Sequence, residues 1–169
     1  MLACTDPLAL IANLPDSSLT ADSSAVYMGD DSDNLPIHSR LQNTETGIGG
    51  WLTGNTGNPW IQADLLSVYY VSAVATQGRG RHSAFHWVTR YTLSYGFNAL
   101  AVQNVLDEDG NTKVFSGNSN RDTVVRNTFF PVRAQIMRII PTAWNGSPTL
   151  RWELYGCFTG NSALMLCRA

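Results

Sequence analysis

The clearest strand pattern in the chain is Trp60-Ile61-Gln62-Ala63-Asp64-Leu65, followed after a short gap by Val71-Ser72-Ala73-Val74-Ala75-Thr76-Gln77-Gly78-Arg79. In the first run the side chains alternate, with Ile61 and Leu65 on an apolar face and Gln62 on the opposite face. A period of two is that of a β-strand. The second run is rich in valine and small residues, which also favours a strand. We therefore predict two strands joined by a turn, and a loop that opens at Gly78.

Strand-like segments recur along the rest of the chain and are separated by turn residues. They cover residues 19–21, 88–95, 124–131, 134–141 and 150–156, and the third and fourth of these each end at a proline. No segment shows a helical stripe. Short strands at regular spacing predict a single all-β domain, either a sandwich or a barrel.

Composition narrows the classes of partner and location. The chain has 169 residues, of which 44% are apolar and 14% are charged, and its net charge is −2. Lys113 is the only lysine, so no broad positive field favours nucleic acid or an anionic membrane. No apolar run reaches the length of a transmembrane helix, and the N-terminus lacks the basic-then-apolar layout of a signal peptide.

Three cysteines, Cys4, Cys157 and Cys167, lie toward the ends of the chain. A disulfide between Cys4 and Cys157 would tie the two ends together and would indicate an oxidising compartment. The alternative is a pair of buried free thiols in a cytosolic protein. Cys167 would then pair between chains or with nothing.

No set of residues has the spacing of a catalytic or metal site. The three histidines, His38, His82 and His86, have no cysteine or carboxylate at zinc-ligand spacing. Residues 30–34 are rich in aspartate but lack the calcium-loop spacing, and residues 107–109 read as a solvated acidic turn. We therefore expect a protein that binds a partner without catalysis, cofactor or metal.

The order of several short motifs resembles the discoidin family, also called the coagulation factor V/VIII type C domain. The motifs that carry the resemblance are Cys4 with Pro7-Leu8, Leu19-Thr20-Ala21, Arg40-Leu41, Gly50-Trp51, residues 60–65, Ala75-Thr76-Gln77-Gly78, Trp87-Val88 with Tyr91, Phe115-Ser116-Gly117-Asn118, residues 136–141 with Trp144-Asn145, and residues 150–157. No single motif is decisive, but the shared order over residues 4–157 is specific.

The resemblance implies a fold, a set of boundaries and a location. The fold is a galactose-binding-like jelly-roll β-sandwich of about eight strands, with Cys4 and Cys157 bridged. The domain covers residues 4–157, with an N-terminal remnant at 1–3 and a C-terminal tail at 158–169. The family is extracellular, secreted or part of an ectodomain, and binds ligands through loops at one end. Here these loops are residues 24–34, 47–58 and 78–87.

One partner that the resemblance implies is a membrane that contains phosphatidylserine. Tyr27 and Met28 would insert into the bilayer, and Arg79 and Arg81 would contact phosphate. Asp30 and its neighbouring aspartates lie in the same loop and would be repelled by the anionic surface.

A second implied partner is a protein. Thr76-Gln77-Gly78-Arg79 is similar to the collagen-binding receptor branch of the family, so Arg79 is carried over from that branch. The tryptophan that this branch has in the first loop is absent from residues 26–28, and His86 stands where the branch has a glutamate. The sequence of residues 73–78 and 87–89 is similar to the corresponding sequence in the contactin-associated, neurexin-like adhesion proteins.

A third implied partner is a sugar, because lectins and carbohydrate-binding modules share this fold. A pyranose is bound by an aromatic ring together with planar hydrogen-bonding groups. The third loop brings such groups close in sequence, and Asn55 and Asn58 in the second loop would lie near them. The third-loop residues are Arg79, Arg81, His82, Phe85, His86 and Trp87.

We expect an extracellular recognition or adhesion module that contacts a protein or glycan, with phosphatidylserine membranes and lectin-like sugar binding as alternatives. The expected ligand-binding residues are Tyr27, Met28, Asp30, Asn55, Arg79, Arg81, His82, Phe85 and His86. Four tryptophans are expected to be core or supporting residues, namely Trp51, Trp60, Trp144 and Trp152. Trp87 is expected to plug the core.

Overall fold

The computed structural model describes residues 6–26, 28–29, 31–81 and 83–158. Three short 3₁₀ helices are present, η1 (Asp16–Ser18), η2 (Ser32–Asn34) and η3 (Pro36–His38). The strands are β1 (Leu8–Ala9), β2 (Leu19–Ala21), β3 (Trp51–Leu52), β4 (Ile61–Gln77), β5 (Trp87–Asn98), β6 (Ala101–Asn104), β7 (Val114–Ser116), β8 (Val125–Asn145) and β9 (Thr149–Phe158). The prediction of an all-β domain is confirmed, with nine strands in the described part of the chain where about eight were expected.

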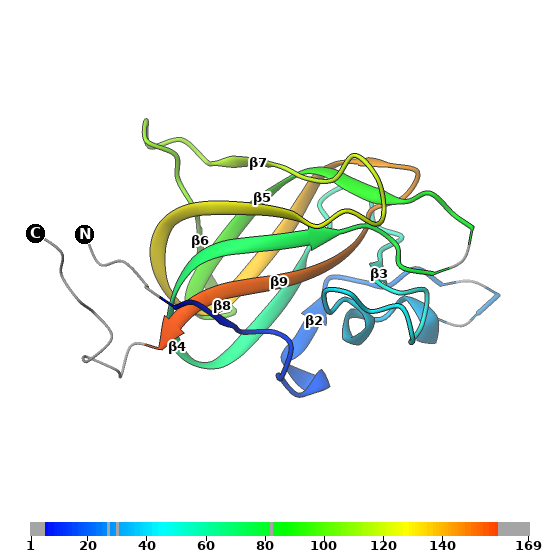
Figure 1. The fold of residues 1–169 in the computed structure, drawn as a ribbon, viewed down its shortest axis with the longest axis horizontal. Coiled ribbons are helices and arrows are strands. Elements are labelled where there is room, and N and C mark those ends of the chain that lie inside the picture. The colour runs from blue at the N-terminus through cyan, green and yellow to red at the C-terminus, as the bar shows by residue number, and fades with distance from the viewer. Residues whose placement is uncertain (1–5, 27, 30, 82, 159–169) are drawn as a thin grey trace, which may run out of the picture.

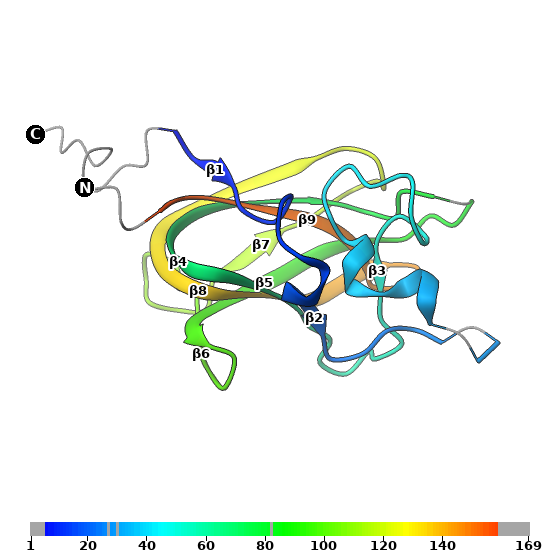
Figure 2. The same cartoon turned by 90° about the horizontal axis from the view of Figure 1, so that it is seen from below.

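The strands pair antiparallel throughout. The main path runs β1-β9-β4-β8-β5-β6, while β2 pairs with β4, β3 with β9 and β7 with β5. Figures 1 and 2 show how this sheet forms a sandwich: β4 and β8 curve together at one end and pass from one layer into the other.

The predicted turn between two strands at residues 60–76 is wrong, because β4 is continuous from Ile61 to Gln77. The chain bends at a bulge instead: the pairing with β8 shifts register between Asp64 and Tyr69, and again between Val71 and Ala73. Leu66 has a φ of 60° there, and its N–H donates to the Asp64 carboxylate at 2.8 Å. A bulge of this kind increases local twist and lets one strand serve both layers.

The prediction of two proline-ended strands at residues 124–141 is also wrong, because β8 runs unbroken from Val125 to Asn145. Pro131 lies within the second register shift, between the pairs that Thr128 and Val132 make with β4. Pro141 lies beyond Ile139, which pairs with the first residue of β4. Proline is tolerated in a strand at bulges and edges because the missing donor is not needed there.

The alternation read in the first run is confirmed. Ile61, Ala63 and Leu65 are buried in the core. The outer face is covered by Arg138, whose guanidinium lies 4.2 Å from the Trp60 ring centroid and donates to Gln62 Oε1 at 2.7 Å. The polar side chain of Gln62 on this face therefore has a hydrogen-bond partner in Arg138.

The five tryptophans fall into two groups by their burial. Trp51 and Trp152 are fully buried, and their indole N–H groups donate to Ser23 O at 2.9 Å and Ser39 Oγ at 3.1 Å. Trp60, Trp87 and Trp144 are only partly buried. The expected role of Trp51, Trp60, Trp144 and Trp152 as core or supporting residues stays a prediction. Trp87, which was expected to plug the core, is only partly buried.

The first strand pairs with the last, because β1 runs antiparallel to β9. Cys157 on β9 is disulfide-bonded, whereas Cys4 and Cys167 lie outside the described residues. The predicted pairing of Cys4 with Cys157, and the boundaries at residues 3 and 157, stay predictions. Glu153, also on β9, is buried and accepts backbone N–H groups from Leu10, Ile11, Ala12 and Leu154.

Candidate functional site

Backbone hydrogen bonds join the three predicted loops into one surface. Gly80 N donates to Gly49 O at 2.6 Å and Arg81 N to Ile48 O at 3.0 Å, which fastens the third loop to the second. Ile48 N donates in turn to Asp33 O at 2.9 Å, which fastens the second loop to the first. Figure 1 shows this loop surface at the end of the sandwich opposite the bend in β4 and β8.

A buried arginine holds this surface from below. The side chain of Arg151 is 2% exposed, and Nε donates to Gly78 O at 2.7 Å. Its Nη1 donates to Asn43 O at 3.2 Å and its Nη2 to Arg121 O at 2.9 Å. Burial lowers the pKa of Arg151, although the nearby Asp122 opposes that change. One guanidinium thus fixes three loop segments by their carbonyls, a use that suits its rigid donor fork.

Gln77, which is paired with Arg151 across the β4–β9 ladder, extends this anchor. Its side chain is 3% exposed and its Oε1 accepts a hydrogen bond from Gln42 N at 2.9 Å. Its Nε2 donates to Asp122 O at 2.7 Å. The buried polar pair at the end of β4 and β9 is therefore satisfied by loop backbone, so the loops are positioned with little freedom.

Arg79 lies on the loop surface and is half-buried. Its backbone N–H donates to His86 O at 2.9 Å and its Nε to Arg81 O at 3.0 Å. Burial lowers the pKa of Arg79, the positive charge of Arg121 lowers it further, and Asp33 raises it. Arg121 therefore lies near Arg79 on this surface, and its own Nε lies 3.6 Å from the Asp122 carboxylate.

Phe85 is the exposed aromatic residue of the third loop. Its side chain is 66% exposed, so the ring is accessible to a ligand. The guanidinium of Arg121 lies 5.4 Å from the ring centroid, and Asn145 Nδ2 donates to Phe85 O at 2.7 Å. The ring thus lies beside the Arg121 guanidinium, and the Phe85 backbone is fixed by Asn145.

His86 lies behind this group. Its Nδ1 is buried without a hydrogen-bond partner among the described residues, and a side chain at Gly146 would contact the ring. Burial lowers the pKa of His86, and the positive charge of Arg79 lowers it further. The imidazole is therefore neutral at neutral pH, and it reports on charge near Arg79.

Two other predicted residues shape the loops. Arg81 Nη1 donates to Glu45 O at 2.8 Å and to Gly47 O at 3.1 Å, so part of its guanidinium is used within the protein. Asn55 Nδ2 donates to the Asp22 carboxylate at 2.6 Å, and its Oδ1 accepts from Gly57 N at 2.9 Å. Arg81 also accepts the hydrogen bond from Arg79 Nε through its carbonyl, whereas the hydrogen bonds of Asn55 are to Asp22, Thr53 and Gly57.

The tip of the first loop is apolar and open to solvent. Met28 is 92% exposed and Val26 is 66% exposed, and Met28 has a φ of 51°. Tyr27, Asp30 and His82, which belong to the predicted site, lie outside the described residues.

Sequence reasoning missed three residues of this end: Gln77, Arg121 and Arg151. Arg151 lies in a strand of otherwise buried side chains, and a charged residue in such a strand is rare enough to be a signal. Gln77 ends a buried run in the same way. Arg121 lies in the connection before β8, which carries no motif, and only the fold brings it to Arg79.

Neither a metal site nor a membrane-spanning helix was found in the described residues. No group of three or more histidine, cysteine or carboxylate side chains there could hold a metal ion. No helix in the same part of the chain is long and apolar enough to cross a membrane.

The chain matches only a small part of its relatives, which are much longer proteins. The chain is 33% identical over 159 residues to pig (Sus scrofa) coagulation factor V, covering 91% of this chain and 7% of factor V. It is 41% identical over 115 residues to human (Homo sapiens) contactin-associated protein 1, covering 66% of this chain and 8% of that protein.

The fold and the family model agree with these relatives. The structure of discoidin II from Dictyostelium discoideum aligns with a TM-score of 0.75 at 25% identity, covering 90% of this chain and 58% of discoidin II. The model of the F5/8 type C domain matches residues 18–154, which confirms the resemblance read from the motifs. The chain therefore belongs to the F5/8 type C, or discoidin, domain family.

Proposed function

We propose that this domain is an extracellular recognition or adhesion module that binds an anionic group on a protein or glycan through its loop surface. Arg79 and Arg121 would bind the anion, and Phe85 would contact the adjoining part of the ligand. The observation that carries the proposal is the Arg121 guanidinium 5.4 Å from the centroid of the Phe85 ring, which is 66% exposed. Arg79 lies on the same loop surface, where its N–H donates to His86 O.

Two like charges held together favour a ligand of opposite charge. The positive charge of Arg121 lowers the pKa of Arg79 and the negative charge of Asp33 raises it, while the Asp122 carboxylate lies 3.6 Å from Arg121 Nε. An anion placed near both guanidinium groups would add to the compensation that these two carboxylates already provide. Guanidinium groups match carboxylate and sulfate or phosphate geometry with two parallel hydrogen bonds. The exposed Phe85 ring offers a flat apolar face to a sugar or a side chain.

The anchor beneath the surface supports the same reading. Arg151 and Gln77 fix the loops through buried hydrogen bonds, so little ordering entropy remains to be lost when a ligand binds. The disulfide at Cys157 fits an oxidising compartment. The name of contactin-associated protein 1 records a protein partner for that relative, and we extend a partner of this class to this chain.

An array of acidic and neutral glycans, with acidic peptides alongside, tests the proposal. We expect retention of carboxylated or sulfated ligands and loss of about tenfold or more in affinity for Arg79→Ala and for Arg121→Ala, because hydrogen bonds to charged groups contribute about 1.5–3 kcal/mol. Arg133→Ala is the matched control, since Arg133 is an exposed arginine outside the loop surface. Equal binding by all three variants would refute the assignment.

A second candidate function is peripheral binding to membranes that contain phosphatidylserine. It is favoured by the apolar tip of the first loop, where Met28 is 92% exposed and Val26 is 66% exposed. Co-sedimentation with vesicles with and without phosphatidylserine tests it. If the candidate is correct, Met28→Ser weakens binding, whereas binding without lipid dependence excludes it.

A further inference from the structure

A pocket of about 550 Å³ lies away from the loop surface. It opens between β8 and the hairpin that joins β6 to β7, and Figure 1 shows this hairpin at the end of the sandwich opposite the loops. Ligand sites in proteins typically have volumes of about 300–1,000 Å³. The lining residues are Tyr95, Val105, Leu106, Asp107, Glu108, Lys113, Thr128, Phe129, Phe130 and Val132.

The hairpin wall is a built structure. Val105 is 2% exposed, and its N–H donates to Leu93 O at 2.9 Å, while Lys113 N donates to Val105 O at 2.9 Å. The Asp107 carboxylate accepts N–H groups from Asp109 at 3.1 Å and from Asn111 at 2.9 Å, which closes the turn. The wall is thus fixed to β5 and by its own turn.

The floor of the pocket is aromatic and partly open. Phe129 is 8% exposed and lies edge-on to Phe115, with ring centroids 5.8 Å apart. Its neighbour Phe130 is 75% exposed, and Leu106 on the hairpin is 53% exposed. Large apolar side chains left in solvent beside a hollow are typical of contact sites.

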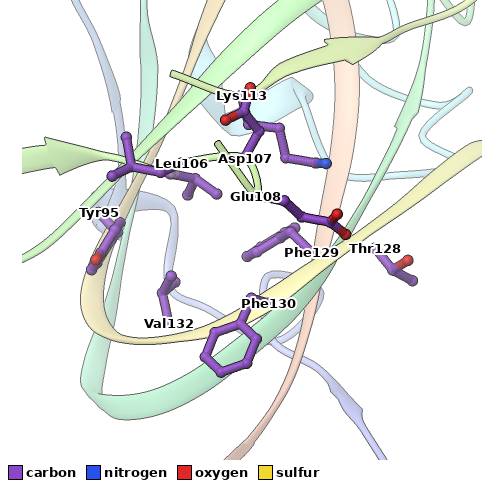
Figure 3. A pocket seen from close by; sticks show the side chains of 10 residues that line it. Tyr95, Leu106, Asp107, Glu108, Lys113, Thr128, Phe129, Phe130 and Val132 are labelled. Carbon is purple, nitrogen blue, oxygen red and sulfur yellow. The ribbon is translucent and has the colours of Figure 1, made fainter. Parts of the chain in front are cut away.

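The rim is acidic. Figure 3 shows Asp107, Glu108 and Lys113 on one side of the pocket and Tyr95, Leu106 and Val132 on another. Within the described residues neither carboxylate forms an ion pair, and Lys113 Nζ lies 5.5 Å from the Phe115 ring centroid. Two carboxylates against one ammonium leave a net negative rim over an apolar floor.

We propose that this pocket binds a peptide segment in which a large apolar side chain is followed by an arginine or lysine. The apolar side chain lies on the floor against Phe130 and Leu106, and the cation contacts Glu108 at the rim. Six of the ten lining residues are apolar or aromatic, which disfavours a sugar with its ring of hydroxyls. The acidic rim disfavours a fatty acid or an anionic lipid.

An NMR titration of the isotope-labelled domain with N-acetyl-leucyl-arginine amide tests this site. We expect saturable shifts at the amides of Glu108, Lys113 and Phe130. N-acetyl-leucyl-glutamate amide and N-acetyl-glycyl-arginine amide, which lack the cation and the apolar side chain, should each bind at least about tenfold more weakly.

Two variants at exposed positions test the residues themselves. Glu108→Lys and Phe130→Ser should each weaken binding of the peptide amide by about tenfold without changing the melting temperature. Glu45→Lys makes the same charge change at an exposed position in the loop end and should leave binding unchanged. The proposal is overturned if the leucyl-arginine amide causes no saturable shifts up to about 10 mM, or if the leucyl-glutamate amide binds equally well. It is also overturned if decanoate or methyl galactoside causes these shifts and the leucyl-arginine amide does not.

Discussion

The two ends of this sandwich are held by different forces. At the loop end, Arg151 and Gln77 are buried and fix loop carbonyls by hydrogen bonds. Beneath the pocket at the other end, Phe129 packs edge-on against Phe115 at 5.8 Å, and Phe115 stacks in turn on Tyr91, partway along β5, at 5.4 Å. The loop end therefore depends on directional polar bonds, and the hairpin end depends on apolar burial.

This difference explains which kind of surface each end presents. Loops fixed through their carbonyls leave side chains such as Arg79 and Phe85 to face solvent, which suits recognition of a polar ligand. A cluster of aromatics that extends to the surface at Phe130 leaves an apolar hollow, which suits a side chain from a partner.

Phe115→Ala should have the largest effect, about 4 kcal/mol lost from the free energy of unfolding. The side chain is 2% exposed and contacts two aromatic rings, so its removal leaves a cavity. Denaturant unfolding measures the loss. The rate of amide hydrogen exchange should increase more at Val105 and Lys113 than at Gly80. An equal increase in the exchange rate at both ends would contradict the difference between the hairpin end and the loop end.

Arg151→Met should lower the free energy of unfolding by about 3 kcal/mol, because three loop carbonyls lose their buried donor. Exchange should quicken at Gly80 and Arg81, with Val105 protected. Arg126→Met is the matched control: its guanidinium is exposed and lies 4.2 Å from the Tyr155 ring centroid, so a loss below about 1 kcal/mol is expected. Equal losses of unfolding free energy for the two variants would show that the buried hydrogen bonds of Arg151 contribute no more than an exposed arginine does.

Tyr91 should make the protein sensitive to alkali. Burial raises the pKa of Tyr91 to about 12, whereas an unfolded tyrosine titrates near 10. The folded state therefore binds the proton more tightly, and about 2.5 kcal/mol of stability present below pH 10 is lost as the pH rises through about 12. Unfolding curves between pH 9 and about 12 measure this, and Tyr91→Phe should flatten that slope.

His86 should report the charge on the loop surface with the smallest effect. Its folded pKa is depressed by burial and by Arg79, so the stability it contributes is present above the unfolded pKa and lost as the pH falls through the folded one. An NMR titration of the ring should show its pKa rising toward the ordinary value in Arg79→Ala. No rise would mean that Arg79 does not act on it.

The sequence predicted the fold and the loop end but not how that end is held. Period-two alternation at residues 60–65 identified the core face correctly, because burial on one side is visible in a single strand. The continuity of β4 and β8 was missed, since a bulge at Leu66 and a proline at Pro131 carry the same local signals as a turn. Tertiary pairing decides between a bulge and a turn.

Sites assembled from distant segments were less visible still. Arg79, Phe85 and His86 could be proposed together from the sequence because they share one loop. Arg121 reaches them only through the fold, and the pocket beside Phe130 joins segments that no motif connects. Its hairpin read as a solvated turn at residues 107–109, and the aromatic floor beneath it comes from β8.

The most direct test of the account compares glucuronate with glucose, which differ by one carboxylate, in NMR titrations of the labelled domain. The central claim is that paired guanidinium groups on the loop surface bind an anion. Glucuronate should then shift the NMR signals of the Arg79 Nε–H and the Phe85 amide and raise the His86 pKa. Glucose should cause none of these changes, and Arg121→Ala should remove the difference between the two sugars. Equal responses to the two sugars, or a response that survives Arg121→Ala, would contradict it.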